Sequence, residues 1–304
     1  MSVAAIAVLA VVGATATGKS DLGVALAQAL GGEVVNADAM QLYRGMDIGT
    51  AKLPVPQRSG VPHHLLDVLD VREEASVAAY QRQVLGTVDD IAARGKVAVV
   101  VGGSGLYVRA ALDRLEIPPT DPAVRAELER DAVVLGAAAM HERLASVDHV
   151  AAQHILPGNV RRVVRALEVV TLTGRPFSAT LPTPDYLRPT VQLGLDAPRE
   201  VLDTRIEHRV GQMWAAGLLE EVAALDAAGL REGRTAARAV GYAQALGQLD
   251  GALTRQQAQD ETARLTRRLS RRQRSWFGRD PRVTWLPYDD PDLVAAALAA
   301  VHGR

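Results

Sequence analysis

The stretch "GATATGKS", residues 13–20, follows a continuous apolar run near the start of the chain. It matches the phosphate-binding loop pattern G-x-x-x-x-G-K-[ST] at its fixed positions, Gly13, Gly18, Lys19 and Ser20. Such a loop turns backbone N–H groups inward and adds the positive start of a helix and a mobile lysine. Ser20 can place its hydroxyl on Mg²⁺. The sequence therefore predicts a strand, a loop and a helix that bind a polyphosphate with Mg²⁺.

The loop indicates a polyphosphate ligand but does not single out ATP, because any diphosphate ester with Mg²⁺ satisfies the same donors. Switch and motor NTPases usually end a later strand in a metal-binding aspartate. Here "VAVVVGGSG", residues 97–105, ends in glycine and serine, and the chain has no guanine-reading N-K-x-D motif. A GTPase switch is therefore disfavoured, while a small-molecule kinase remains open.

Apolar runs alternate with helical patterns through the first third of the chain. Residues 4–12 predict a strand, 19–30 a helix, 31–38 a second strand, 77–95 a helix, and 96–107 a third strand running into a glycine turn. This alternation is typical of a doubly wound parallel α/β sheet, here of the P-loop NTPase-like kind.

The character of the chain changes near "EIPPTDP", residues 116–122, and stays helical and polar until about Pro189. A strand is predicted over 190–198, and the longest of the closing helices over 255–277. We therefore expect an α/β core with C-terminal helices, residues 1–117 and 190–304, and a helical insertion domain, residues 118–189.

The composition of the chain excludes several kinds of chemistry and argues against a membrane association. The chain has no cysteine, which excludes disulfides, thiol nucleophiles and cysteine-ligated zinc. No run of 18 apolar residues is free of glycine and charge, and the apolar N-terminus lacks a basic segment. We expect a cytoplasmic protein, with no membrane partner, that is a monomer.

Two polar residues should emerge at the same sheet edge as the loop, because parallel strands bind ligands at their carboxyl ends. Asp38 ends the second strand and is a candidate general base, metal ligand or cap of the next helix. Ser104 lies in "GGSG", where it is a site residue or an ordinary turn residue. Adjacent His63 and His64 lack spaced partners, which favours packing over metal binding.

Arginines gather in "RLTRRLSRRQRSWFGR", residues 264–279. Helical spacing puts Arg264, Arg268, Arg271 and Arg272 on one face. That stripe suits an RNA backbone, although a solvated helix paired with acidic residues gives the same pattern.

The chain resembles the tRNA dimethylallyltransferases, also called tRNA isopentenyltransferases, over nearly its whole length. The resemblance rests on "GATATGKS", "NADAMQLYRGMDIGTAK", "PHHLLDV", "GGSGLY", "RALEVVTLTGRPFS", "GLLEEV", "AVGYAQAL" and "TRRLSRRQRSWF". It implies transfer of a dimethylallyl group from dimethylallyl diphosphate to N6 of adenosine 37 of tRNA, just 3′ of the anticodon. The products are N6-dimethylallyladenosine and diphosphate, and the implied partners are Mg²⁺ and the tRNA anticodon stem-loop.

The resemblance also implies residue roles. Asp38, Lys19 and Ser104 match catalytic positions, and Asp38 would take the proton from the adenine amine. Diphosphate or nucleotide binding falls on Gly13, Ala14, Thr15, Ala16, Thr17, Gly18, Lys19, Ser20 and Arg209, with Ser20 on Mg²⁺. Contact with tRNA falls on Asp38, Ala39, Met40, Gln41, Ser104, Arg125, Arg161, Arg162, Val163, Val164, Arg165, Arg238, Ala239, Val240, Gly241, Tyr242 and Ala243.

Four departures from the family pattern stand out. Arg161 stands where the family usually has glutamine, and Ser104 stands where many relatives have threonine, so a hydroxyl is kept. In the loop, Ala14 replaces a common proline and Thr17 a common serine. A nucleoside or nucleotide kinase is the alternative function, but it leaves "YRGMDIGTAK", residues 43–52, and the insertion unexplained.

Overall fold

The computed structural model describes residues 6–180 and 185–303, and it divides into two compact units. Unit 1 comprises Met1–Asp113 and Tyr186–Arg304, and unit 2 comprises Arg114–Asp185. The insertion expected from the sequence, 118–189, begins and ends four residues later than unit 2. Residues 4 and 5 of the first expected strand, and 181–184 of the expected insertion, lie outside the described residues.

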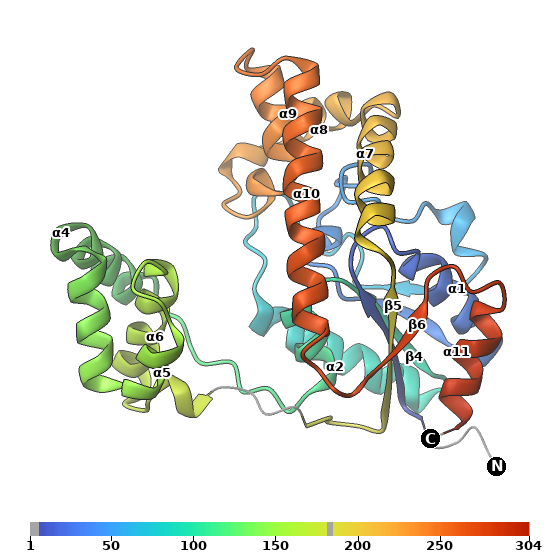
Figure 1. The fold of residues 1–304 in the computed structure, drawn as a ribbon, viewed down its shortest axis with the longest axis horizontal. Helices are drawn as coiled ribbons and strands as arrows, with labels where there is room; N and C mark the ends of the chain where they lie inside the picture. Colours follow the sequence, from blue (N-terminus) through green and yellow to red (C-terminus); the bar gives the residue numbers. More distant parts are fainter. Residues whose placement is uncertain (1–5, 181–184, 304) are drawn as a thin grey trace. The chain divides into compact units, whose positions relative to one another are not determined.

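Unit 1 is built on a six-stranded parallel sheet with the strand order β3-β2-β4-β1-β5-β6 (Figure 1). Every residue of β1, β2 and β4 is buried, since helices cover both faces, and this explains the unbroken apolar sequences of β1 and β4. The strands are β1 (Val8–Gly13), β2 (Glu33–Asn36), β3 (His63–His64), β4 (Ala98–Gly102), β5 (Thr190–Asp196) and β6 (Val283–Pro287).

Helices pack on the two faces of this sheet. On one face, Leu22 and Leu26 of α1 share an apolar cluster with Ala297 and Val301 of α11. On the other face, α2 and α3 pack together, and α10 contacts both α3 and β1. The bounds are α1 (Lys19–Leu30), α2 (Val77–Ala93), α3 (Gly105–Leu112), α10 (Arg255–Phe277) and α11 (Leu293–His302).

A second apolar core of unit 1 joins the C-terminal helices to the segment that follows β2. Tyr43 and Met46 from that segment are fully buried beside Trp214, Leu218 and Tyr242. The segment is therefore held as part of the core, although it has little regular structure. The remaining elements are α7 (Arg199–Ala215), α8 (Leu218–Ala227), α9 (Tyr242–Leu249) and the 3₁₀ turns η2 (Met40–Leu42), η3 (Val55–Arg58), η5 (Leu230–Glu232) and η6 (Ala236–Arg238).

Unit 2 is helical and has an apolar core of its own, which includes Met140, Leu144 and Leu167. Gly136, with φ 83° and ψ 167°, breaks the first helix into two. The elements are α4 (Pro122–Val147), α5 (His149–His154), α6 (Val160–Thr173) and η4 (Phe177–Thr180). Within the described ranges of both units, no helix is long and apolar enough to cross a membrane.

The α/β fold class predicted from the sequence is confirmed, and two predicted helices, 19–30 and 255–277, coincide with α1 and α10. The third predicted strand does run into a glycine turn, after β4 ends at Gly102, but α3 already begins at Gly105, within the stretch 96–107. β3 and β6 were not predicted, because they have two and five residues at the sheet edges and carry little pattern.

Candidate functional site

The phosphate loop joins β1 to α1 and is held by bonds within itself. Gly13 and Gly18 have φ 132° and 92°, values that favour glycine, and a Cβ on Gly13 would lie 3.1 Å from Leu195 O. Thr17 Oγ1 and Lys19 Nζ both donate to Ala14 O, at 2.9 and 2.5 Å. The loop is therefore shaped before any ligand binds.

The start of α1 is a site for an anion. Among the described residues, no side chain caps this helix at Gly18, so its first N–H groups face the loop without that partner. Arg205 donates to Ala16 O at 3.2 Å, which fixes a non-glycine residue with φ 68°. The loop therefore presents N–H donors, Lys19 and the exposed Ser20 on one side.

Asp38 follows β2 and is fixed by a short local network. Its backbone N–H donates to Asn36 Oδ1 at 2.9 Å, and Asn36 Nδ2 donates back to Asp38 O at 3.0 Å. The carboxylate oxygen Oδ1 accepts a bond of 2.9 Å from Met40 N. Asp38 thus bonds to the backbone at the start of η2, whose N-cap residue is Ala39, and its side chain also lines a cavity.

The second glycine turn, at the end of β4, lies against the end of β2. A Cβ on Gly102 would collide with Ala37 O, so only glycine permits this approach. The next turn residue, Ser104, accepts a bond of 3.2 Å from Ala39 N through its hydroxyl. Ser104 therefore contacts the residue after Asp38, as expected if the two strand ends meet at one edge.

A cavity of about 650 Å³ opens at this carboxyl edge. Its volume lies within the range of small-ligand sites. Asp38 and the phosphate loop share its wall, so the structure brings together the two features that the sequence singled out first. The predicted residues that line it are Thr15, Ala16, Gly18, Lys19, Ser20, Asp38, Gln41 and Arg209.

The charges at this cavity are perturbed by burial. Burial lowers the pKa of Lys19 to about 8, although the nearby Asp38 raises it and Arg209 lowers it further. Burial raises the pKa of Asp38, against the opposing effects of its bond from Met40 N and the charge of Lys19. Burial also lowers the pKa of Arg209. Perturbed groups that face one cavity are typical of a functional site.

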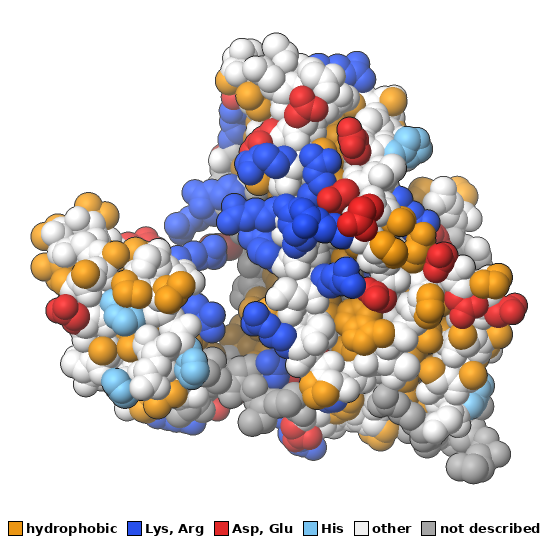
Figure 2. All heavy atoms as spheres, viewed as in Figure 1, with side chains coloured by type: hydrophobic (Ala, Val, Ile, Leu, Met, Phe, Trp, Pro, Cys, Tyr) orange, Lys and Arg blue, Asp and Glu red, His pale blue; other side chains and the backbone are white. Residues whose placement is uncertain are grey.

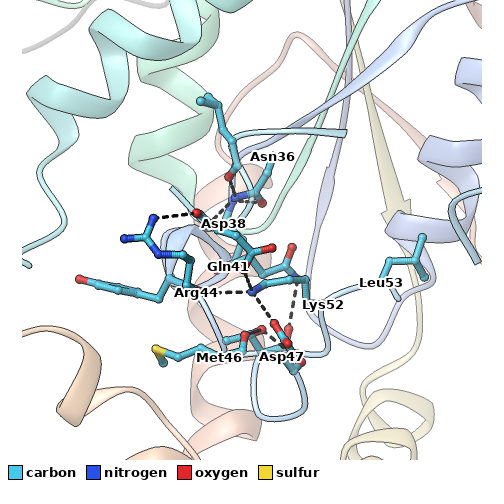
Figure 3. A network of polar contacts seen from close by, with 12 residues as sticks. Asn36, Asp38, Gln41, Arg44, Met46, Asp47, Lys52 and Leu53 are labelled. Carbon is cyan, nitrogen blue, oxygen red and sulfur yellow. Dashed lines mark hydrogen bonds and ion pairs between the residues drawn. The ribbon is translucent and has the colours of Figure 1, made fainter. Parts of the chain in front are cut away.

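Lys52 organises the segment that forms another part of the cavity wall, although sequence reasoning gave it no role (Figure 3). Its ammonium is buried and donates to Tyr43 O at 2.9 Å, and to Asp47 and Asp67 carboxylates at 2.6 Å each. Gln41 Nε2 donates to Thr50 O at 3.1 Å across the same segment. The rarity of lysine, with three in the chain, was the available signal.

Glu221 anchors the same segment from α8. Its carboxylate accepts from Ile48 N at 2.7 Å, from Asp47 N at 3.2 Å and from Gly49 N at 3.4 Å. Tyr242 Oη of α9 donates to it at 2.6 Å. One carboxylate thus joins two helices to the cavity wall. In the sequence, its segment, "GLLEEV", counted only as one of the stretches that carry the family resemblance, and no role was predicted for Glu221.

We expect Glu221→Ala to destabilise the protein by about 1–3 kcal/mol, the usual cost of leaving buried donors unpaired. The donors affected are the backbone N–H groups of the segment that follows β2 and the buried Tyr242 hydroxyl. Urea unfolding measures the change, and Glu220→Ala, at the exposed neighbouring position, is the control. Equal stability of the two variants would show that Glu221 anchors nothing.

The residues 238–243 of unit 1, which were expected to contact RNA, differ in how far their side chains are exposed to solvent. Arg238 is exposed, at the end of η6, whereas the Tyr242 side chain is fully buried and bonded to Glu221. Ala239 and Gly241 are also buried, while Val240 and Ala243 are half-buried. Arg238 is therefore the side chain of this group that is open to a large ligand, and the others shape the backbone around it.

In unit 2, two of the four predicted arginines contact one buried carboxylate. Arg125 and Arg165 donate to Glu168 Oε2 at 2.5 and 2.7 Å. Arg161 and Arg162 are exposed on α6, whereas Val163 and Val164 are buried in the apolar core of unit 2. The "RRVVR" stretch thus presents two arginines outward and packs its valines inward, as its helical spacing dictates.

Helix α10 carries an arginine surface, defined as Arg264, Arg268, Arg271, Arg272 and Arg274, all exposed. Figure 2 shows basic side chains gathered over this helix. Arg264 pairs with Glu261 and Arg274 with Asp196. For these two arginines, the alternative of a solvated helix paired with acidic residues is therefore correct. No ion pair joins Arg268, Arg271 or Arg272 to a carboxylate in the described ranges.

Metal binding by protein groups alone is not supported: the described residues contain no group of three His, Cys, Asp or Glu side chains placed to hold a metal ion. Ser20 is the predicted magnesium ligand, and it is exposed at the start of α1. A magnesium ion held mainly by substrate phosphates and water needs few protein ligands. The loop therefore fits magnesium that arrives with a diphosphate.

Comparisons with known proteins agree on one family. The family model for IPP transferase matches residues 41–280. A tRNA dimethylallyltransferase of Kineococcus radiotolerans is 63% identical over 288 residues, covering 93% of this chain and 91% of the relative. Hundreds of further curated proteins are also significantly similar in sequence to this chain.

Solved structures give the same result. The tRNA isopentenylpyrophosphate transferase of Bacillus halodurans has a TM-score of 0.70 and 39% identity, over 97% of this chain and 94% of that one. A eukaryotic dimethylallyltransferase acting on tRNA has a TM-score of 0.82 and 27% identity, over 96% of this chain and 77% of that one. With these matches and the phosphate loop facing Asp38, this chain belongs to the IPP transferase family.

Proposed function

We propose that this protein transfers a dimethylallyl group from dimethylallyl diphosphate to N6 of the tRNA adenosine just 3′ of the anticodon. One observation carries the proposal at the level of chemistry: an anion-binding loop and a carboxylate line a single cavity. The N6–carbon bond forms, the allylic carbon–oxygen bond breaks, its electron pair leaves with diphosphate, and the N6 proton passes to a base.

The phosphate loop would hold the leaving group. Charge grows on the diphosphate oxygens as the carbon–oxygen bond breaks, and donors aimed at that charge stabilise the transition state. Lys19 and the N–H groups at the start of α1 lie on the loop, and Arg209 lines the same cavity. Bound Mg²⁺ would neutralise part of the same charge, with Ser20 as its protein ligand.

Asp38 would accept the N6 proton. Burial raises its pKa, which makes it a stronger base than an ordinary aspartate, while its bond from Met40 N and the charge of Lys19 act in the opposite direction and favour the ionised form. The Asn36 and Ser104 contacts fix the backbone on either side of it. The carboxylate is thereby oriented before the substrates bind.

The adenine must leave the stacked loop of the RNA to reach Asp38, because its amine is inaccessible inside a stack. The arginine surface of α10 and the exposed Arg161 and Arg162 of unit 2 would bind the RNA backbone. The monomeric state and the cytoplasmic location expected from the sequence stay predictions.

Diphosphate release from dimethylallyl diphosphate, measured with and without tRNA, tests this function. We expect release that requires both tRNA and Mg²⁺. The kinase alternative explains the phosphate loop but predicts that ATP loses its terminal phosphate to a small molecule without RNA. Diphosphate release that ignores RNA would argue against a tRNA substrate.

We expect unit 2 to be removable without unfolding unit 1, with a loss of tRNA affinity. The chain leaves and returns at adjacent points, because Asp113 pairs with Tyr186 and Leu187 N donates to Leu112 O at 2.8 Å. A short Gly-Ser linker in place of 114–185 can therefore close the chain.

In this shortened protein, tRNA binding should weaken by at least about tenfold, equivalent to 1.4 kcal/mol, while dimethylallyl diphosphate still binds. Filter binding and calorimetry measure the two affinities. Unchanged tRNA affinity would rule out an RNA-binding role for unit 2, and lost diphosphate binding would show that unit 1 does not fold alone.

A further inference from the structure

Gln273 is a buried amide in the middle of the arginine surface of α10. It is 8% exposed, although Arg272 and Arg274 on either side are exposed. Its Oε1 accepts a bond of 2.9 Å from Thr15 N in the phosphate loop. Its Nε2 donates a bond of 3.0 Å to Gly103 O in the second glycine turn. One side chain therefore joins two turns that lie 88 residues apart in the sequence (15 and 103).

Both turns that Gln273 joins belong to the cavity. Thr15 and Gly103 line its wall, and so does Gln273 itself. Beyond Gly103, the Ser104 hydroxyl bonds to Ala39 N, next to Asp38. A chain of single hydrogen bonds thus leads from the phosphate loop through Gln273 and the second glycine turn to the segment that holds the carboxylate.

The second glycine turn packs closely against the Gln273 amide, and the two bonds of Gln273 restrict the polar groups that can replace it. A Cβ on Gly103 would collide with Gln273 Nε2, so the turn is fitted to the amide. The two bonds need one acceptor and one donor on the same planar group, which an amide supplies. Ionised glutamate could accept from Thr15 N but would repel Gly103 O, and methionine could make neither bond.

We propose that Gln273 is a positioning residue for the transfer reaction, setting the spacing between the phosphate loop and the second glycine turn that supports Asp38. The proposal rests on the function proposed above. In the proposed reaction, the phosphate loop binds the diphosphate, and Asp38, beside the second glycine turn, accepts the N6 proton. The distance between these two turns therefore sets the distance between the two groups that act in the reaction. A misplacement of about 1 Å between groups that act together can slow a reaction by about 10²-fold.

The first test replaces Gln273 with methionine, which keeps the length and removes both bonds. With saturating dimethylallyl diphosphate and tRNA, we expect kcat to fall by about 10- to 100-fold. The KM for dimethylallyl diphosphate should change much less, because the loop keeps Lys19 and its own N–H groups. Gln256→Met is the matched control, since Gln256 is exposed on the same helix and bonds to Asp260.

The second test replaces Gln273 with glutamate and follows the rate against pH. A protonated carboxyl can accept from Thr15 N and donate to Gly103 O, as the amide does. The rate of Gln273→Glu relative to the wild type should therefore rise as the pH falls, whereas the relative rate of Gln273→Met should stay level. Because the wild type is measured at each pH, the ratio removes the pH dependence that the two proteins share.

The outcomes separate the two proposals. If the wild type transfers the dimethylallyl group and Gln273→Met does so within about twofold of it, the positioning role is wrong while the function stands. A relative rate of Gln273→Glu that is flat with pH also overturns the role, even if the methionine variant folds poorly. A wild type that transfers nothing contradicts the function and this role with it.

Discussion

Replacing Lys19 with alanine is expected to slow dimethylallyl transfer by roughly 10²–10³-fold, the scale for removing one charge-stabilising donor. Lys19 is the lysine of the phosphate loop, and its ammonium lies inside the loop against Ala14 O. Lys19 would stabilise the negative charge that grows on the diphosphate as the carbon–oxygen bond breaks. Its loss should therefore lower kcat more than the affinity for dimethylallyl diphosphate. Single-turnover rates with saturating substrates measure the effect directly.

Lys96→Ala is the matched control for this change. Lys96 precedes β4, at the amino end of the sheet, where it pairs with Glu33. It is thus at the opposite edge from the phosphate loop, and the buried Glu33 keeps its ion pair with Arg94 when Lys96 is replaced. The control should transfer at close to the wild-type rate. A Lys19→Ala protein as fast as this control would contradict the assignment of the loop to the leaving group.

Asp38→Asn should lower kcat by about 10²–10⁴-fold, the contribution typical of a general base, while leaving the binding of both substrates nearly intact. Asparagine keeps an oxygen for the bond from Met40 N but cannot take up a proton. The change therefore separates two of the three roles that the sequence left open, the general base and the helix cap. A base predicts a large loss of rate, and a helix cap predicts almost none.

Asp290→Asn provides the control, because Asp290 Oδ1 accepts from the N–H two residues ahead, in Asp292, as Asp38 does from Met40. The pH dependence gives a second check. Since the base must be ionised, kcat should fall as the pH drops through the pKa of Asp38. Burial raises this pKa, so the loss should begin at a higher pH than for an ordinary aspartate. A loss of at most tenfold in Asp38→Asn would discredit the base.

The parts of the fold that the sequence predicted well are those in which local and tertiary preferences agree. Helix α10 has a capping box, with Thr254 and Gln257 bonding to each other's backbone N–H, and it has amphipathic spacing. Strands β1 and β4, in the middle of the sheet, are apolar throughout because both faces are covered. β3 depends instead on pairing with β2, since two residues such as His63 and His64 have no strand signal of their own.

The site was predictable where a residue acts through its place in a local motif. The phosphate loop, Asp38 and Ser104 follow from strand ends that meet at one sheet edge. Glu221 and Gln273 were missed because their partners are brought to them by the tertiary fold: Glu221 bonds to a segment more than 170 residues away (172, 173 and 174), and Gln273 to one 258 residues away. Lys52 was missed although its partners lie only 5 to 15 residues away, because the sequence does not show that they converge on one buried ammonium. Burial of such polar groups becomes meaningful only when their partners are known.

The family resemblance supplied the substrates, which local chemistry does not specify. A loop that holds a diphosphate serves a kinase and a prenyltransferase equally well, and the difference lies in what faces the loop. Here the facing group is Asp38, on the wall of a cavity of about 650 Å³. The relatives, at up to 63% identity among those compared, resolve the choice that the motif left open.

Mass spectrometry of nucleosides from tRNA incubated with the protein, Mg²⁺ and dimethylallyl diphosphate tests the central claim most directly. We expect N6-dimethylallyladenosine at the position 3′ of the anticodon, in an amount that falls sharply with Asp38→Asn. If the tRNA stays unmodified, and the same protein moves the terminal phosphate of ATP to a small molecule, the phosphate loop serves phosphoryl transfer and the proposed reaction is wrong.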